Sequence, residues 1–299
     1  MVSSLFVPLD GSPAAELALP LAAAVARNAH ASLELVSVHR PYVFDNPHAQ
    51  NAWMTKVDPE REAEVIRSEE AYLAEAAGKA AADAGISPKT MVLTGSSVDA
   101  FAVASTLLET AKAHHSDLIV MTTRARGLVT RVGLGSVADE LVRGSHVPLL
   151  LVPPTEEAVE GEATSELTHI LVTLDGSDLS EQILAPAVEL AALMGARCTL
   201  LRVIGAKEGV DVKVDAEQYL ERQAASARER GVAVDTRVVQ ASRVSDAIVE
   251  AAETVGADVI ALATHGYGGF KRLMFGSVAD KLIQHARLPI LVRCPTCAT

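Results

Sequence analysis

Two stretches of this chain, DLIVMTTRARGLVTRVGLGSVADELVRGSHVPLLLV (117–152) and DVIALATHGYGGFKRLMFGSVADKLIQHARLPILVR (258–293), align with each other without a gap. Each contains the pentapeptide GSVAD, followed by an apolar run that a proline leads. Nearer the start, LFVPLDGSPAAELALPLAAAVA (5–26) aligns with ILVTLDGSDLSEQILAPAVELA (170–191). Because these features recur in the same order, the sequence predicts a tandem duplication of one fold.

The duplication divides the 299 residues into two domains of ordinary size, which we expect at 1–153 and 167–299. Between them, residues 154–166 are polar and acidic and are typical of a linker. The two Leu-Asp-Gly-Ser copies lie further apart along the chain than the two GSVAD copies, so the first half carries an insertion, most of it within 41–70, which includes Trp53. A long segment of this kind can form a lid or an interface, or it can pack as a flap on its own domain.

Short runs rich in Val, Leu and Ile alternate with amphipathic stretches in each half, which is typical of strands covered on both faces. Helix starts are expected at Asp58, with Pro59 in the first turn, and at Asp215. The sequence therefore predicts an α/β fold with two similar, doubly wound, Rossmann-like domains, each built on a five-stranded and mainly parallel sheet. The expected strands are 4–9, 33–38, 90–94, 117–122, 147–152, 169–174, 198–204, 234–239, 258–263 and 288–293.

Composition narrows the class of partner. The formal net charge is −12 and no Lys/Arg-rich block is present, which argues against a nucleic-acid partner. The N-terminal residues lack the pattern of a signal peptide and the apolar runs are too short to span a bilayer, so we expect no membrane partner and a cytoplasmic location. Cys294 and Cys297 form a C-x-x-C without the neighbours that a redox or zinc site needs, so no metal site is expected.

Two loops in each half have the composition of a ligand site. Asp10-Gly11-Ser12 and Asp175-Gly176-Ser177 follow the first strand, and Gly276-Ser277 opens a helix whose first N–H groups have no intrahelical partner. In a doubly wound sheet both loops lie at the carboxyl ends of the strands, where ligands bind. Residues of this kind could together bind a nucleotide. The alternative is purely structural, because a serine before a helix is most often only an N-cap and glycines are ordinary turn residues.

The Leu-Asp-Gly-Ser loops and the two GSVAD segments resemble the universal stress proteins in their tandem two-domain form. The resemblance implies a motif G-x-x-G, nine residues, then G with Ser or Thr, which holds the phosphates and ribose of ATP. The second half departs from it only at Ala263, whereas the first half has Thr122 and Ala125 in place of both leading glycines. The expected adenine-nucleotide residues are Asp10, Gly11, Val38, Gly135, Ser136 and Val137 in the first half and Asp175, Gly176, Val203, Ala263, Thr264, His265, Gly266, Gly269, Gly276, Ser277 and Val278 in the second.

Three functions follow as hypotheses. The first is an ATP-binding stress-response regulator or sensor, with Mg²⁺ as an optional companion, whose second half binds nucleotide and whose first half binds it more weakly or not at all. The second is an interaction scaffold without nucleotide, and the third is an enzyme that acts on an adenylated or phosphorylated substrate. His265 lacks a carboxylate to orient it, so no catalytic residue is assigned.

The resemblance also concerns the last strand of each half, which mediates dimerisation in that family. The two halves are therefore expected to join as an intramolecular pseudo-dimer, and the chain is expected to form a homodimer and to act on an unknown protein partner.

Overall fold

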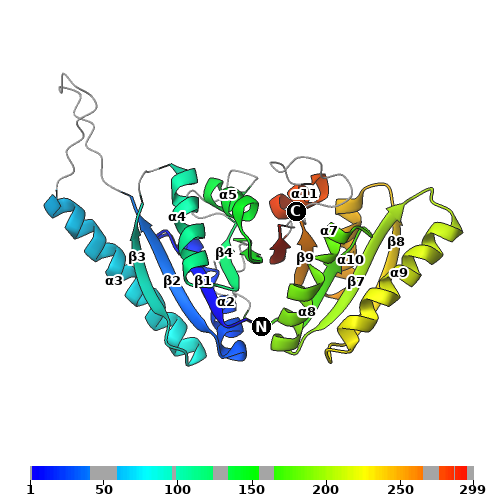
Figure 1. The fold of residues 1–299 in the computed structure, drawn as a ribbon, viewed down its shortest axis with the longest axis horizontal. Coiled ribbons are helices and arrows are strands. Elements are labelled where there is room, and N and C mark those ends of the chain that lie inside the picture. Colours follow the sequence, from blue (N-terminus) through cyan, green and yellow to red (C-terminus); the bar gives the residue numbers. More distant parts are fainter. Residues whose placement is uncertain are drawn as a thin grey trace, which may run out of the picture.

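The structure is a computed structural model that describes residues 2–40, 59–95, 99–123, 134–154, 165–264, 276–285 and 287–294. The two halves share one ten-stranded sheet in the order β3-β2-β1-β4-β5-β10-β9-β6-β7-β8 (Figure 1). Within each half all strand pairs are parallel, and the strand order reverses beside the first strand. The α/β fold with two doubly wound domains of five strands is thereby confirmed.

The first half contains strands β1 to β5 and helices α1 to α5. The strands are β1 (Ser4–Pro8), β2 (Ser32–His39), β3 (Lys89–Thr94), β4 (Leu118–Thr122) and β5 (Leu149–Val152). The helices are α1 (Pro13–Glu16), α2 (Leu19–Ala29), α3 (Pro59–Ala84), α4 (Ala100–Ala113) and α5 (Ser136–Gly144).

The second half repeats this order. Its strands are β6 (His169–Thr173), β7 (Arg197–Gly205), β8 (Val234–Ala241), β9 (Val259–Ala263) and β10 (Ile290–Arg293). Its helices are α7 (Asp178–Glu181), α8 (Leu184–Met194), α9 (Val210–Arg228), α10 (Val244–Val255) and α11 (Ser277–His285). Each of the ten expected strands overlaps an observed one, because continuous apolar runs suit strands that are buried on both faces.

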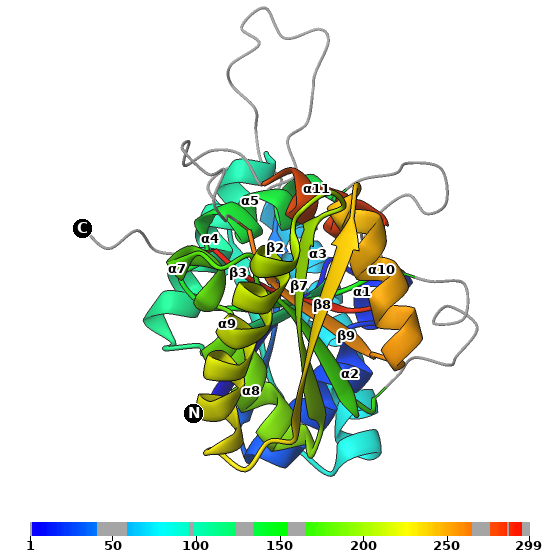
Figure 2. The same ribbon diagram turned by 90° about the vertical axis from the view of Figure 1, so that its right-hand side faces the viewer.

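The sheet separates two apolar cores. One core packs α2, α3, α8 and α9 against the sheet, and the other packs α4, α5, α10 and α11 against the opposite face. Figure 2 shows α9 and α10 on opposite sides of β7 and β8. Each core contains buried residues of both halves, so the duplication has produced one continuous interior.

The two halves join edge to edge through β5 and β10, which pair antiparallel with Leu150 opposite Leu291. Both leucines are buried, at 0% and 1% exposure, so the joint is apolar at its centre. On one side of the sheet, α2 contacts α8, where the Asn28 amide lies 3.4 Å from the Met194 sulfur. The intramolecular pseudo-dimer expected from the sequence is therefore present, and it removes two apolar strand edges from solvent.

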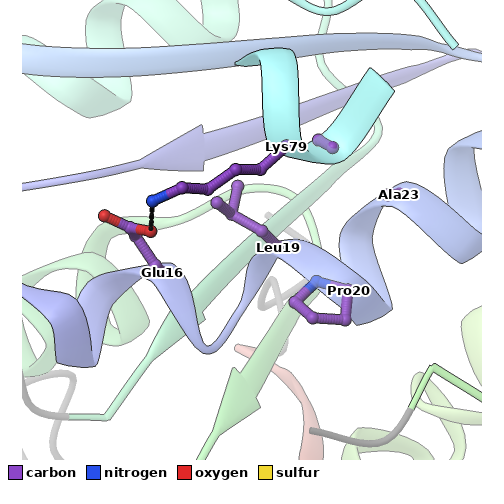
Figure 3. Close-up of a pocket in the computed structure, with 6 residues that line it drawn as sticks. Glu16, Leu19, Pro20, Ala23 and Lys79 are labelled. Carbon is purple, nitrogen blue, oxygen red and sulfur yellow. Dashed lines mark hydrogen bonds and ion pairs between the residues drawn. The ribbon is translucent and has the colours of Figure 1, made fainter. Parts of the chain in front are cut away.

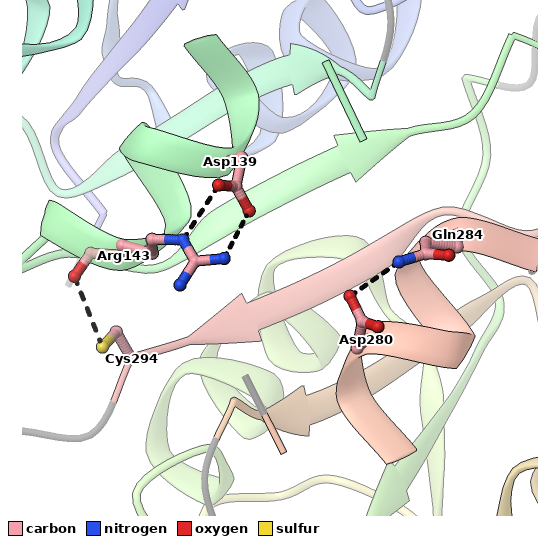
Figure 4. A network of polar contacts seen from close by, with 5 residues as sticks. All are labelled: Asp139, Arg143, Asp280, Gln284 and Cys294. Carbon is pink, nitrogen blue, oxygen red and sulfur yellow. Dashed lines mark hydrogen bonds and ion pairs between the residues drawn. The ribbon is translucent and has the colours of Figure 1, made fainter. Parts of the chain in front are cut away.

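On the other side of the sheet, α5 and α11 lie above this joint (Figure 4). Arg143 makes two 2.9 Å bonds to the carboxylate of Asp139, and its backbone carbonyl accepts a 3.7 Å bond from the Cys294 thiol of the other half. In α11 a neutral residue, Gln284, takes the place of Arg143, and its side-chain amide donates to the Asp280 carboxylate at 2.7 Å. Each GSVAD aspartate therefore bonds a residue four positions on in its own helix, and the Cys294 thiol makes the bond between the halves.

One expected helix start was wrong. Asp215 lies inside α9, which begins at Val210 after the N-cap Gly209. Residues 59–70 of the insertion form the first turns of α3, whereas Asp58, Trp53 and the rest of 41–58 lie outside the described residues. None of the helices in the described ranges has the length and apolar character needed to cross a membrane.

Candidate functional site

The Asp-Gly-Ser loops have the same hydrogen bonds in both halves. The Asp10 Oδ1 atom accepts bonds from the Ser12 N–H (3.0 Å) and hydroxyl (2.6 Å), and Asp175 accepts the same two from Ser177 at 2.9 and 2.6 Å. Each serine in turn caps the short helix that follows. One carboxylate oxygen of each aspartate thus holds the turn through the backbone and side chain of its serine.

The glycine of each loop adopts a backbone that other residues avoid, with φ of +82° at Gly11 and +90° at Gly176. A side chain at either position would strain the turn. The two environments differ, because a Cβ at Gly11 would meet nothing within 4 Å, whereas one at Gly176 would lie 2.9 Å from the Arg202 guanidinium.

The GSVAD segments open α5 and α11, as expected. Gly135 N–H donates to the carbonyl of Thr123 at 2.9 Å, and Gly276 N–H donates to that of Thr264 at 2.8 Å, so each helix start is tied to the end of the neighbouring strand. Ser136 and Ser277 are the first helical residues and are exposed, and the N-cap of α5 is Gly135. The alternative in which the serine serves as an N-cap is therefore wrong for α5.

The remaining expected residues fall into two groups. Val38 and Val203, at the ends of β2 and β7, are partly buried against the core that includes α5 and α11, and Val137 and Val278 pack against the same core. Ala263 is the last residue of β9, and Thr264, which follows it in the chain, is buried. His265, Gly266 and Gly269 lie outside the described residues, as do Ala125 and its neighbouring arginines.

In the structure a tyrosine and a glutamate lie close to each Asp-Gly-Ser loop, and the sequence analysis named neither of them. Burial, followed by the charge of Glu16, raises the pKa of Tyr72 (α3), and burial with the charge of Glu181 raises that of Tyr219 (α9). The two glutamates occupy equivalent positions after their Asp-Gly-Ser loops, which was a readable signal. The tyrosines lie at different distances from the loops along the chain, since the insertion changes the spacing, and only packing brings them together.

The halves also differ at the end of the second strand. His39 is fully buried, its Nδ1 atom lies 3.0 Å from Glu69 Oε2, and its Nε2 atom lies 3.5 Å from Glu62 Oε1. These contacts tie β2 to the extended N-terminal part of α3. The equivalent residue of β7 is the apolar Ile204, so this tie is particular to the half that carries the insertion.

A cavity of about 170 Å³ lies elsewhere, between α2 and α3 (Figure 3). Its floor is apolar, and an ion pair of 3.1 Å between Lys79 and Glu16 lies at one side. None of the expected nucleotide residues lines it, so it is not the candidate site. Cys198 offers no nucleophile either, because burial raises the pKa of its thiol to about 12.

Comparison with known proteins places the fold. The family model of the universal stress protein family matches residues 1–153 and 166–293. A universal stress protein of Mycobacterium tuberculosis is 25% identical over 96% of this chain and 93% of its own length. Another universal stress protein from the same organism is 27% identical to this chain. The alignment covers 60% of this chain and 62% of that relative's length.

Solved structures agree on the architecture. A universal stress protein from Archaeoglobus fulgidus superposes with a TM-score of 0.70 at 19% identity, covering 98% of both chains. A second one from that organism, in complex with dAMP, matches 42% of this chain at 24% identity with a TM-score of 0.36, too low to place a ligand here. Two matched domains, the strand order and the paired loops lead to one conclusion: the chain belongs to the universal stress protein family.

Proposed function

We propose that this protein binds ATP in its second half and acts as a nucleotide-dependent regulator or sensor in the stress response, in the cytoplasm. The observation that carries the proposal is the meeting of two loops at the reversal of strand order. The Asp175–Ser177 loop follows β6, the Gly276-Ser277 helix start is tied to the end of β9, and these two strands pair. In a doubly wound sheet this crevice is where nucleotides bind.

The residues present fit such a ligand. A Cβ at Gly276 would lie 3.2 Å from the Thr264 carbonyl oxygen, so a glycine lets the helix start pack closely on the end of β9. The N–H groups of the first turn of α11 and the exposed Ser277 hydroxyl would hold phosphates. Asp175 would bind ribose or the adenine amino group, and Val203 would line the adenine pocket. Mg²⁺ bound beside the phosphates of ATP would neutralise part of their negative charge.

The proposal ranks the two halves. Their helix starts match in hydrogen bonds and in exposure, so α5 itself does not weaken the first site. The difference lies in sequence, since Gly266 is preserved in the second half where the first has Ala125 beside Arg124 and Arg126. The bulk of the two arginines would occupy the space of a phosphate; the alternative is that their guanidinium groups contact the phosphate directly. The first half is therefore proposed to bind ATP weakly or not at all.

Isothermal titration of the whole chain with ATP and Mg²⁺ tests this directly. We expect one dominant site, and Ser277→Ala should weaken it about tenfold, because a hydrogen bond to a charged phosphate is lost. Ser136→Ala at the equivalent position is the matched control and should change the affinity by less than about twofold. Two equal sites, or a larger effect of the control, would contradict the ranking.

A second candidate function, a scaffold that acts through its surfaces alone, is favoured by the outer strands. Within the described chain β3 pairs only with β2, and β8 only with β7, so each leaves one edge for a partner or for a homodimer. Binding of ATP at 100 times its Kd would stabilise the fold by about 2.7 kcal/mol. No rise in melting temperature at millimolar ATP and Mg²⁺ would select the scaffold, and phosphate release at ordinary turnover would select an enzyme.

A further inference from the structure

Arg202 lies near the carboxyl end of β7, at the edge of the sheet where the Asp175–Gly176–Ser177 loop begins. The Leu174 N–H donates to the Leu201 carbonyl at 2.9 Å, and the register of β6 and β7 places Arg202 level with Leu174, the residue before Asp175. In the first half the Leu9 N–H donates to the Val36 carbonyl at 2.7 Å, so the equivalent residue is Ser37. The two halves thus place different side chains at one backbone position.

The guanidinium of Arg202 contacts both the loop and a helix. It lies 5.1 Å from the centre of the Tyr219 ring on α9, and a Cβ at Gly176 would be 2.9–3.1 Å from three of its atoms. A planar cation that stacks on an aromatic ring is held more rigidly than a flexible ammonium would be. The loop glycine, the guanidinium and the tyrosine therefore form a packed unit, which we call the Arg202 stack.

The first half lacks this stack. Ser37 is buried at 6% exposure, and the space that a Cβ at Gly11 would enter is open to 4 Å. The Lys79 side chain of α3, which is half exposed, pairs with Glu16 and not with the loop aspartate. The loop of the first half is thus without a cation from its second strand.

We propose that Arg202 is a positioning residue that holds the Asp175–Gly176–Ser177 loop against Tyr219 and so makes the second half the tighter nucleotide site. The inference rests on the proposed function for its ligand, and on the contacts of the Arg202 stack for the loop. The guanidinium packs at Gly176, the residue next to Asp175, and its charge would offset part of the repulsion between the Asp175 carboxylate and an incoming phosphate.

Hydrogen exchange of the whole chain without nucleotide tests the loop itself. In Arg202→Ala the Ser177 and Ser180 amides, which are hydrogen-bonded in the loop, should exchange about tenfold faster. Tyr219→Leu should reproduce this effect and Tyr219→Phe should not, because the ring is kept. The amides of Ser12 and Ala15 in the first half are the internal control. Unchanged exchange at Ser177 and Ser180 would overturn the proposal.

Titration with ATP and Mg²⁺ tests the consequence. Arg202→Ala should weaken the dominant site about tenfold, and Arg202→Lys should restore part of the affinity, since the charge returns without the planar stack. Ser37→Ala is the matched control and should leave the affinity unchanged. An Arg202→Ala protein that binds ATP as the wild type does would overturn the inference. A wild-type chain that binds no ATP would overturn the proposed function instead, while the exchange measurement still decides the role of Arg202 in the loop.

Discussion

In the first half the second strand ends in Ser37, Val38 and His39, whereas the equivalent residues of the second half are Arg202, Val203 and Ile204. The first set ties the strand to α3 through a buried histidine between two carboxylates, and the second places the Arg202 guanidinium against the loop at Gly176. The backbone hydrogen bonds around both sets agree. The two copies have therefore kept the same backbone of the sheet, because a change there would alter many contacts. Their side chains at the strand ends have diverged.

The largest expected effect breaks the joint between the halves. Leu150→Ala and Leu291→Ala should each lower the free energy of unfolding by about 3 kcal/mol, because each leaves a cavity at a buried position. The two leucines face each other across the antiparallel pair, so the double variant should differ from the sum by more than about 0.5 kcal/mol. Urea denaturation measures all three, and strict additivity would indicate that the two leucines do not stabilise each other across the joint.

The loop glycines give the next effect. Gly11→Ala and Gly176→Ala should each cost about 1 kcal/mol, because both backbones have positive φ. Gly176→Ala should cost more, since its Cβ would also displace the Arg202 guanidinium. Denaturation in an Arg202→Ala background is the control, where the difference between the two glycines should vanish. Equal losses in the wild-type background would contradict the contact.

A smaller effect concerns the fourth helical segment of each half. Asp99 caps α4 by accepting a 2.8 Å bond from the Ala102 N–H, whereas the N-cap of α10 is Arg243, which makes no side-chain cap bond. Arg243→Asn should therefore stabilise the protein by about 0.5–1 kcal/mol. Asp99→Ala should lower stability by a similar amount in the same thermal or chemical unfolding assay, and a destabilising Arg243→Asn would refute the comparison.

The smallest effect is confined to acidic pH. His169 is buried, its ring nitrogens lie 3.0 Å from the Val255 carbonyl and 2.8 Å from the Thr199 hydroxyl, and burial followed by Arg197 lowers its pKa. The unfolded chain takes up a proton near the ordinary pKa of about 6.5, while the folded chain resists it. Stability is thus complete above that pH and falls as the pH decreases below it.

Denaturation between pH 7.5 and 5 measures this slope. His169→Ser, which installs the residue found at the equivalent position 4, should lower stability at neutral pH but flatten the decline. Burial also lowers the pKa of His146, so part of the slope should remain in the variant. An unchanged slope would show that His169 is not the buried neutral group.

Much of the fold could be predicted from the amino-acid sequence. The ten apolar runs, the repeated Leu-Asp-Gly-Ser loops and the GSVAD helix starts predicted the strands, the doubly wound domains and the edge of the sheet where the loops meet. Asp215 misled, because an aspartate is as common in a solvated helix face as at an N-cap, and Gly209 carries no side-chain signal for a cap.

Local patterns therefore determined the elements, their order and the candidate loops, since periodicity and turn chemistry act over a few residues. Only the tertiary structure decided that Leu150 lies opposite Leu291 across the expected joint, and that Arg202 and Tyr219 meet Gly176. These contacts join residues far apart along the chain. They depend on how β6, β7 and α9 pack, which no local pattern encodes.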